Sequence, residues 1–308
     1  MGGTVQRRAR SALGGAAMTE TLGLRPAIRQ FAMGEMRVTA LHDGTRWQEP
    51  LSPPFCLDKS EAELAEIGRA NRLPVHGNRN SFTPMLVESG AHKVLVDVGF
   101  GPDARGTGVG QVVDGLALLG LTPEDITEVM LTHMHPDHIL GLRHDGGPTF
   151  PKASYVMGRV EYDSWKSGAG VPEQRQKNRE MFLNLVVPLA GQTRFLEDGE
   201  TVVPGMVAEA AFGHSPGHMM ARLEGGGRQA LIWGDLANHY VFSVRYPDSP
   251  VGYDDDKDRA IASRRRVLDM AATDDLLVLG HHMPFPAIGF IERYGSAYRW
   301  VPASYQID

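Results

Sequence analysis

The sequence predicts an α/β domain built as a four-layer αββα sandwich, in which two β-sheets lie face to face between outer layers of helices. Apolar, β-branched segments are grouped in the two halves of the chain, and helical segments follow each group. With 308 residues, of which 42% are hydrophobic, the chain can bury the core that one large domain needs. We expect this domain over residues 26–308, after a flexible leader at residues 1–25.

The strands expected in the first half are short apolar runs bounded by turn residues. The first run alternates apolar and polar residues, and Ser89-Gly90 joins the second and third runs as a hairpin. They cover residues 36–42, 82–88, 93–97 and 126–132. Helices are expected over residues 59–69 and 112–119, and Thr122-Pro123, a cap residue followed by proline, begins a short one.

The second half repeats this mixture of short strands and helices. Strands are expected over residues 154–157, 206–212, 219–223, 229–233 and 276–279. Helices are expected over residues 159–165, 173–185 and 256–271. We expect the apolar segment at 276–279 to be the final strand of the domain.

The charge balance excludes one class of function. The formal net charge of −6 argues against nucleic acid as the main partner, because binding to its phosphates requires a basic face. No apolar run approaches the ~20 residues that span a bilayer. The single cysteine, Cys56, cannot form a disulfide within the chain, and we expect it to be a small buried residue. The expected partner is a small-molecule substrate.

The first residues carry an arginine-rich segment with two interpretations. Arg7, Arg8 and Arg10 precede an apolar stretch in the manner of a twin-arginine export signal. That stretch is short and rich in glycine, and no clear cleavage site follows it. A leader with Met18 as the true start, in a cytoplasmic protein, is the favoured interpretation, and export is the alternative.

The strongest functional signal is a cluster of metal-binding residue types, THMHPDH, at residues 132–138. On a strand, alternate residues face the same way, so His133 and His135 can point together. A turn at Pro136 would then direct Asp137 and His138 from the start of a helix. Imidazole and carboxylate groups suit zinc, and also iron, cobalt or manganese. The alternative, a chance cluster of surface histidines, does not account for this spacing.

Further metal ligands are expected downstream, each just past an apolar strand. His214 follows one strand, Asp235 follows a second, and either His281 or His282 follows a third. Each of these residues alone is as easily an ordinary loop residue. Their shared position after strands supports a joint role in metal binding.

Together these residues resemble the metallo-β-lactamase superfamily, in the branch of hydrolases that hold two metal ions. The resemblance implies two divalent ions, with zinc expected and iron, manganese or cobalt as alternatives. It implies that one ion takes His133, His135 and His214. It implies that the other takes Asp137, His138 and His282, with Asp235 bridging both.

Three more assignments depend on this resemblance. His282 is preferred to His281 because HMPFPAIG, at residues 282–289, matches a family stretch that begins with the ligand. Asp97 matches an aspartate near the metal loop that orients a histidine, although an acid that caps a turn explains it equally well. His218 follows the family ligand in the GHSPGH segment, so a supporting or structural role is implied.

Asp235 indicates the branch within the superfamily. True metallo-β-lactamases have cysteine or serine there, whereas lactonases, thioesterases, phosphodiesterases and organophosphate hydrolases have aspartate. Within this group the chain resembles methyl parathion hydrolase and its lactonase-like relatives, from about Met33 to the end. The matching stretches are residues 38–44, 132–138, 150–153, 282–289 and 298–302.

That group lines its substrate pocket with three aromatic side chains. Phe100, Trp165 and Phe182 hold the corresponding positions, and core packing is the alternative for each. The loop at residues 99–108 departs from the group's pattern, which leaves the shape of the pocket open.

The implied reaction is hydrolysis by a hydroxide that bridges the two metals. Asp235 would fix the spacing of the metals, and Asp137 would also carry a proton to the leaving group. The expected substrate is an apolar lactone, such as a quorum signal, or an ester, with organophosphates as a side activity. A dedicated phosphotriesterase is the second hypothesis, and a non-catalytic metal-binding protein is the third. The resemblance also implies a homodimer.

Overall fold

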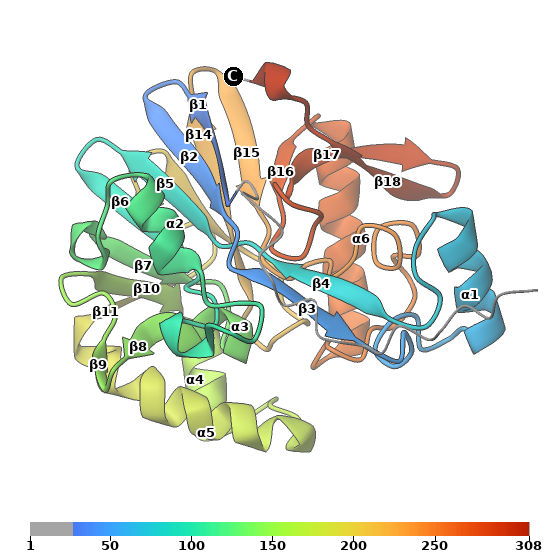
Figure 1. Ribbon diagram of the computed structural model, residues 1–308, viewed down its shortest axis with the longest axis horizontal. Helices are drawn as coiled ribbons and strands as arrows, with labels where there is room; N and C mark the ends of the chain where they lie inside the picture. The colour runs from blue at the N-terminus through green and yellow to red at the C-terminus, as the bar shows by residue number, and fades with distance from the viewer. Residues whose placement is uncertain (1–26, 308) are drawn as a thin grey trace, which may run out of the picture.

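The computed structural model describes residues 27–307, which form two seven-stranded sheets packed face to face with helices on the outside (Figure 1). The predicted four-layer sandwich is thereby confirmed. The predicted leader at residues 1–25, with its arginines and Met18, lies outside the described residues. Within the described residues, the helices lack the length and apolar character that crossing a membrane requires.

The first sheet combines antiparallel strands with parallel ones. The chain enters it through hairpins, and β6, β7, β10 and β11 run parallel to one another. In spatial order its strands are β1 (Ile28–Met33), β2 (Met36–Leu41), β5 (Met85–Ser89), β6 (His92–Val96), β7 (Glu128–Leu131), β10 (Ser154–Gly158) and β11 (Thr193–Leu196).

The second sheet is antiparallel except at one central pair. Its strands follow one another in chain order, and only β15 and β16 run parallel, because α6 connects them. They are β12 (Thr201–Val203), β13 (Met206–Ala210), β14 (Met219–Gly225), β15 (Arg228–Ile232), β16 (Leu277–Leu279), β17 (Ile288–Tyr294) and β18 (Ala297–Pro302).

The main core lies between the sheets, and side-chain alternation builds it. In β7, Met130 points into the core shared by the two sheets, whereas Val129 and Leu131 point to the opposite face. On that opposite face, helices α2, α4 and α5 cover the first sheet. Helix α6 covers the second sheet and adds Val267 and Leu268 to its core.

The helices begin where the sequence places caps. Ser60 and Glu63 form a reciprocal capping box at the start of α1, and Asp256 caps α6. The α-helices are α1 (Glu61–Ala70), α2 (Val112–Leu118), α3 (Pro136–Ile139), α4 (Arg159–Ser167), α5 (Gln176–Leu185) and α6 (Lys257–Thr273). The expected short helix after Thr122 is a single 3-10 turn, Pro123–Asp125.

Three expectations need correction. The strand expected over residues 82–88 is two strands, because Pro84 interrupts it. Its first residue belongs to β4 (Asn78–Phe82), which pairs with β3 (Gly44–Gln48) in a separate two-stranded sheet. The strand at 276–279 is not the last, because β17 and β18 follow it as a hairpin with polar, exposed residues near its turn. The helix expected from residue 173 begins as a 3-10 turn and becomes α-helical at Gln176.

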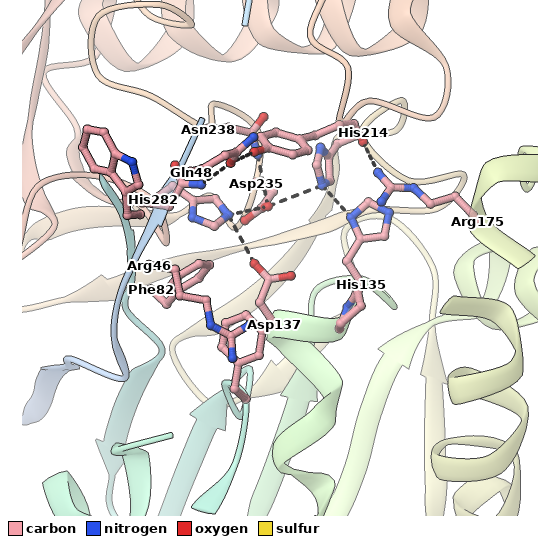
Figure 2. Close-up of a pocket in the computed structure, with 15 residues that line it drawn as sticks. Arg46, Gln48, Phe82, His135, Asp137, Arg175, His214, Asp235, Asn238 and His282 are labelled. Carbon is pink, nitrogen blue, oxygen red and sulfur yellow. Dashed lines mark hydrogen bonds and ion pairs between the residues drawn. The ribbon is translucent and has the colours of Figure 1, made fainter. Parts of the chain in front are cut away.

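The two sheets meet at the edge where the functional motif begins. The backbone N–H of Met219, the first residue of β14, donates to the carbonyl of Thr132 at 2.9 Å. Thr132 directly follows β7, so this hydrogen bond joins the first sheet to the second. The loops that follow β7, β13, β15 and β16 carry His135, His214, Asp235 and His282, whose side chains point toward one another in Figure 2.

Candidate metal centre

The motif at residues 132–138 forms a tight corner after β7. His133 and His135 lie in an extended segment just past the strand rather than on it, and their ring centroids are 4.5 Å apart. Pro136 then begins α3, the position at which proline favours a helix start. Asp137 and His138 leave the first turn of this helix, so four side chains reach one small volume.

The first group of possible ligands is formed by His133, His135 and His214. One nitrogen from each lies within 4.8 Å of the others, and all three residues are buried. His135 Nδ1 lies 2.9 Å from His214 Nε2. His214 arrives from the loop after β13, so residues 79 positions apart in the sequence are brought into contact.

The second group is formed by Asp137, His138, His281 and His282, and Asp235 lies between the two groups. Its Oδ1 atom lies 3.3 Å from His138 Nε2, on the side of the second group. Its Oδ2 atom lies 2.8 Å from His282 Nε2 and 3.4 Å from His214 Nε2. One carboxylate therefore faces both groups, as Figure 2 shows.

The two adjacent histidines at 281 and 282 have different surroundings. His282 lines the pocket, and its Nε2 atom faces both Asp235 and Asp137 (Figure 2). His281 is buried behind it, with its ring 4.1 Å from that of His138. Of the two, only His282 is open to the pocket.

Hydrogen-bond acceptors fix the tautomers of three of these histidines. A carboxylate or carbonyl oxygen can only accept a hydrogen bond, so the ring nitrogen that faces it must carry the proton. When a metal ion takes the place of any second proton, the other ring nitrogen can present its lone pair to the centre. The pairs are His138 Nδ1 with Asp97 Oδ2 at 2.8 Å, His214 Nδ1 with Asp254 Oδ1 at 2.9 Å, and His282 Nδ1 with the Ser81 carbonyl at 2.9 Å.

Asp97 combines the two roles that the sequence suggested for it. Besides holding His138, its Oδ1 atom accepts the backbone N–H of Thr132 at 2.9 Å, which caps the corner before the motif. The residue itself has φ of +61°, a left-handed conformation that aspartate tolerates better than most residues. The end of β6 is thereby fastened to the metal-binding corner.

Two buried acids that support the centre were missed by sequence reasoning. Asp254 holds His214 and is itself paired with Arg264 of α6 at 2.6 Å, with both side chains fully buried. Asp255 lies 3.5 Å from His135 Nε2 and accepts from Arg175 at 2.8 Å. They belong to an acidic run before α6 that the sequence presents only as a helix start.

His218 supports Asp235 through the backbone. Its Nε2 atom accepts the N–H of Asp235 at 3.1 Å, and burial lowers the pKa of its ring to about 3, so the ring stays neutral and able to accept. Gly234, with φ of +55°, makes this approach feasible, because a Cβ there would lie 2.6 Å from His218 Nε2. The turn after β15 therefore requires glycine before the aspartate.

A third missed residue, Glu161 of α4, ties together two of the loops. Its buried carboxylate accepts the backbone N–H of Met134 at 3.0 Å, that of Gly217 at 2.7 Å and the hydroxyl of Ser215 at 2.5 Å. Met134 lies between two motif histidines, and Ser215 follows His214. Burial raises the pKa of Glu161 to about 7. The sequence shows only an ordinary acid in the first turn of a helix.

The charges of the centre favour a cation. Burial alone would raise the pKa of Asp235, but His282 and His138 hold it well below its usual range. Burial alone would lower the pKa of His138, but Asp235, Asp97 and Asp137 raise it well above its usual value. The clustered carboxylates therefore stabilise positive charge at this position.

The donor atoms also fit metal ions in chemistry. His133 Nε2, His138 Nε2 and Asp235 Oδ1 are shielded from solvent and have no hydrogen-bond partner among residues 27–307. Buried polar atoms without partners are rare and need an explanation. Imidazole nitrogens and carboxylate oxygens that converge in this way form a donor set for divalent zinc or a similar metal.

A cavity of about 440 Å³ opens directly onto this centre. Phe82 and Phe100 meet edge to face in its wall, with ring centroids 4.9 Å apart. Asp43 supports the loop of Phe100 by accepting its backbone N–H at 3.1 Å. A cavity of this size holds a small molecule.

The other two aromatic residues expected in the pocket need correction. Phe100 lines the cavity, but Trp165 and Phe182 do not, because α4 and α5 turn them into the core against the first sheet. Trp165 is fully buried, and its Nε1 donates to Ser215 Oγ at 2.9 Å. Its ring meets the edge of His135 from behind, at a centroid distance of 5.8 Å.

Comparison with known proteins gives one family match and several relatives. The family described as the Metallo-beta-lactamase superfamily matches residues 83–281. The structure of AidC, a dizinc quorum-quenching lactonase in complex with a product, is 26% identical and has a TM-score of 0.84. The alignment covers 91% of this chain and 98% of that chain.

Two curated relatives match over shorter stretches. An N-acyl homoserine lactonase of Bacillus cereus is 27% identical over 114 residues, which are 37% of this chain and 39% of the relative. Ribonuclease Z of Nocardia farcinica is 34% identical over 84 residues, which are 27% of this chain and 23% of the relative. The chain thus spans less than half the length of these curated relatives.

Proposed function

The chain belongs to the metallo-beta-lactamase superfamily, and from this membership we propose that it is a hydrolase that uses two metal ions to cleave a lactone or ester bond of a small molecule. One observation carries the proposal. The Asp235 carboxylate faces two adjoining groups of metal-binding side chains, and both groups open onto one cavity of about 440 Å³. The similarity to a dizinc lactonase at 26% identity supports the class of bond.

We assign the metal ligands as two sets that share one carboxylate. The first set is His133, His135 and His214, and the second set is Asp137, His138 and His282, with Asp235 common to both. His282 is assigned because it, rather than His281, faces the cavity. Zinc is the proposed metal, and iron, manganese and cobalt accept the same donors. Bound there, the two ions would acidify a water molecule and polarise the carbonyl of the substrate.

The residues of the chain have separate tasks in this proposal. Asp97 and Asp254 hold the rings of His138 and His214 in a fixed orientation. The carboxylate of Asp137 lines the cavity. Burial alone would raise the pKa of Asp137, but the charge of His138 holds it well below its usual range. Asp137 is therefore ionised at neutral pH, as a metal ligand must be, and its place in the cavity would let its carboxylate pass a proton to the leaving alkoxide.

The open access to the centre argues against a non-catalytic metal-binding protein but not against a phosphotriesterase. A non-catalytic metal-binding protein would shield its ions, yet five of the assigned ligands line the open cavity: His135, Asp137, His214, Asp235 and His282. A dedicated phosphotriesterase could use the same ions, and it would differ in attacking phosphorus rather than a carbonyl carbon. The homodimer remains a prediction from the resemblance.

Elemental analysis with a matched substrate panel tests this proposal. We expect about two transition-metal ions per chain and hydrolysis of a γ-lactone and an aryl ester that a chelator abolishes. A phosphotriester in the same panel distinguishes the alternative, which predicts a higher kcat/KM for the triester than for either other substrate. His92→Gln, which changes a half-exposed histidine outside the cavity, is the control and should retain both metals. Activity that persists in chelator, in protein without transition metal, would end the proposal.

A further inference from the structure

One wall of the cavity presents hydrogen-bond donors, most of which have no acceptor in the described part of the chain. Arg46 and Gln48 are two positions apart on β3, so their side chains leave the same face of the strand, and both line the cavity. Figure 2 shows them on the same side of the cavity as His282, whereas His135 and Arg175 lie on the opposite side. Neither Arg46 nor Gln48 takes part in the proposed metal centre.

Arg46 is a positive charge without a counter-charge among residues 27–307. Its guanidinium lies 4.0 Å from the centre of the Phe100 ring, and Nη2 donates to Thr107 Oγ1 at 2.9 Å. No carboxylate of the described residues forms an ion pair with it, whereas Arg175, the other arginine of the cavity, is paired with Asp255. Guanidinium has five N–H donors, so most of those of Arg46 remain available.

Gln48 also presents its donor side. Its Oε1 atom accepts from Asn80 Nδ2 at 2.7 Å and from the hydroxyl of Tyr253. Burial raises the pKa of Tyr253, so its hydroxyl keeps the proton that it donates. Because these two donors fix which end of the amide is oxygen, the Nε2 group of Gln48 is left with two N–H donors and no acceptor among the described side chains.

A ligand that satisfies this wall must accept hydrogen bonds and carry negative charge. A planar guanidinium fork held against an aromatic ring matches the two oxygens of a carboxylate or phosphate. A wholly neutral ligand would displace water from Arg46 and supply no counter-charge, which is unfavourable.

We propose that the substrate carries an anionic group, a carboxylate or a phosphate, away from the bond that is cleaved, and that Arg46 and Gln48 bind this group. This proposal rests on the proposed hydrolase function and names a substrate class for the same site. Phe100 supports the recognition by holding the guanidinium plane in place.

A pair of esters with acyl chains of equal length tests the proposal. The p-nitrophenyl ester of hexanoic acid is neutral, whereas the mono-p-nitrophenyl ester of adipic acid ends in a carboxylate. We expect the metal-loaded enzyme to favour the adipate ester in kcat/KM by about 10-fold or more at low salt, since a charge-assisted hydrogen bond has that effect. The preference should weaken as salt screens the charge. An ester of the same length that ends in a phosphonate distinguishes carboxylate from phosphate recognition.

The ratio of the two kcat/KM values is also measured in variants. Arg46→Gln should bring the adipate-to-hexanoate ratio near one, Arg46→Lys should restore part of it, and Gln48→Glu should reverse it. Arg37→Gln changes an exposed arginine of β2 outside the cavity and should leave the ratio as in the wild type. A wild-type preference for hexanoate over both anionic esters, or a ratio that Arg46→Gln does not change, would overturn the anionic-substrate proposal. If no ester or lactone is hydrolysed with metals bound, the hydrolase function itself fails.

Discussion

The Asp235 carboxylate lies 2.8 Å from the Nε2 atom of His282, although 47 positions separate the two residues. They meet because β15 and β16 are parallel neighbours, so the loops at their carboxyl ends emerge together. The same carboxylate also faces His138 and His214. Asp235 therefore connects every segment that contributes to the centre.

Replacing Asp235 should remove metal rather than unfold the protein. Asp235→Ala deletes the one carboxylate that faces both groups of ligands, so we expect loss of at least one metal per chain and loss of hydrolysis. Elemental analysis of the purified variant measures the first effect. Asp114→Ala, which removes a surface carboxylate paired with Arg105, is the matched control. A variant with Asp235→Ala that still holds two ions would show that this residue is not a shared ligand.

Glu161 should be a stability residue with an additional effect on metal affinity. Glu161→Ala would leave three donors, on Met134, Ser215 and Gly217, without their acceptor in a buried place. We expect a loss of roughly 3 kcal/mol in the free energy of unfolding and a loss of about 10-fold or more in metal affinity. Urea unfolding and competition with a metal-binding dye measure the two effects. Glu180 is exposed, so the Glu180→Ala control should change neither quantity. A Glu161→Ala protein with wild-type metal affinity would show that Glu161 does not position the metal-binding loops.

Stability should decrease in acid partly through His239. Burial lowers the pKa of this ring to about 3, and its Nδ1 accepts the backbone N–H groups of Val241 and Phe242. The folded protein therefore keeps His239 neutral, whereas the unfolded chain protonates it below its ordinary value near 6.5. The stabilising contribution is complete above that pH and is lost as the pH falls from about 6.5 towards 3.

The measurement for His239 is the free energy of unfolding between pH 8 and pH 5. The wild type should lose roughly 2 kcal/mol more over this interval than His239→Asn, whose side chain accepts hydrogen bonds but does not titrate. The variant has lower stability at pH 8 because it is smaller, so only the difference in slope counts. If the unfolding free energy of both proteins changes equally with pH, the pKa of His239 is not lowered in the folded state.

Substitutions of Trp165 and Phe100 should distinguish a residue of the hydrophobic core from a residue of the cavity wall. Trp165→Phe removes a buried hydrogen bond to Ser215 and leaves a small cavity, so we expect a loss of about 1–3 kcal/mol in unfolding free energy. Phe100→Ala removes part of the cavity wall, so its main effect should be an increased KM for aryl esters. Thermal unfolding and steady-state kinetics on both variants test this division. A large rise in KM for Trp165→Phe at unchanged stability would show that Trp165 contributes to the substrate pocket after all.

The sequence predicted the centre better than its supports. The motif at residues 132–138 gathers four metal-binding residue types within seven positions, and His214, Asp235 and the pair at 281–282 each follow an apolar strand. Local patterns were therefore enough to propose these residues, whereas the choice of His282 over His281 came from the family resemblance. The family and the sandwich fold are confirmed. Glu161 and Asp254 could not be recognised in this way, because their partners lie far along the chain and only the tertiary fold brings them together.

The errors in secondary structure have a similar origin. The β17–β18 hairpin near the C-terminus is exposed around its turn, so its strands lack the continuous apolar run that marks a buried strand. The side chain of Trp165 points into the core because of the way α4 packs on the first sheet. The sequence of the helix shows which residues share a face, but it does not show whether that face meets the core or the cavity.

The assigned ligands come from both sheets: the loop after β7 belongs to the first, and the loops after β13, β15 and β16 belong to the second. A cation held by donors from both halves adds its binding free energy to the contact between those halves. The metals would then link the two sheets, and the sheets could not separate without releasing them. Loading with metal should consequently merge the unfolding of the two halves into one more cooperative transition.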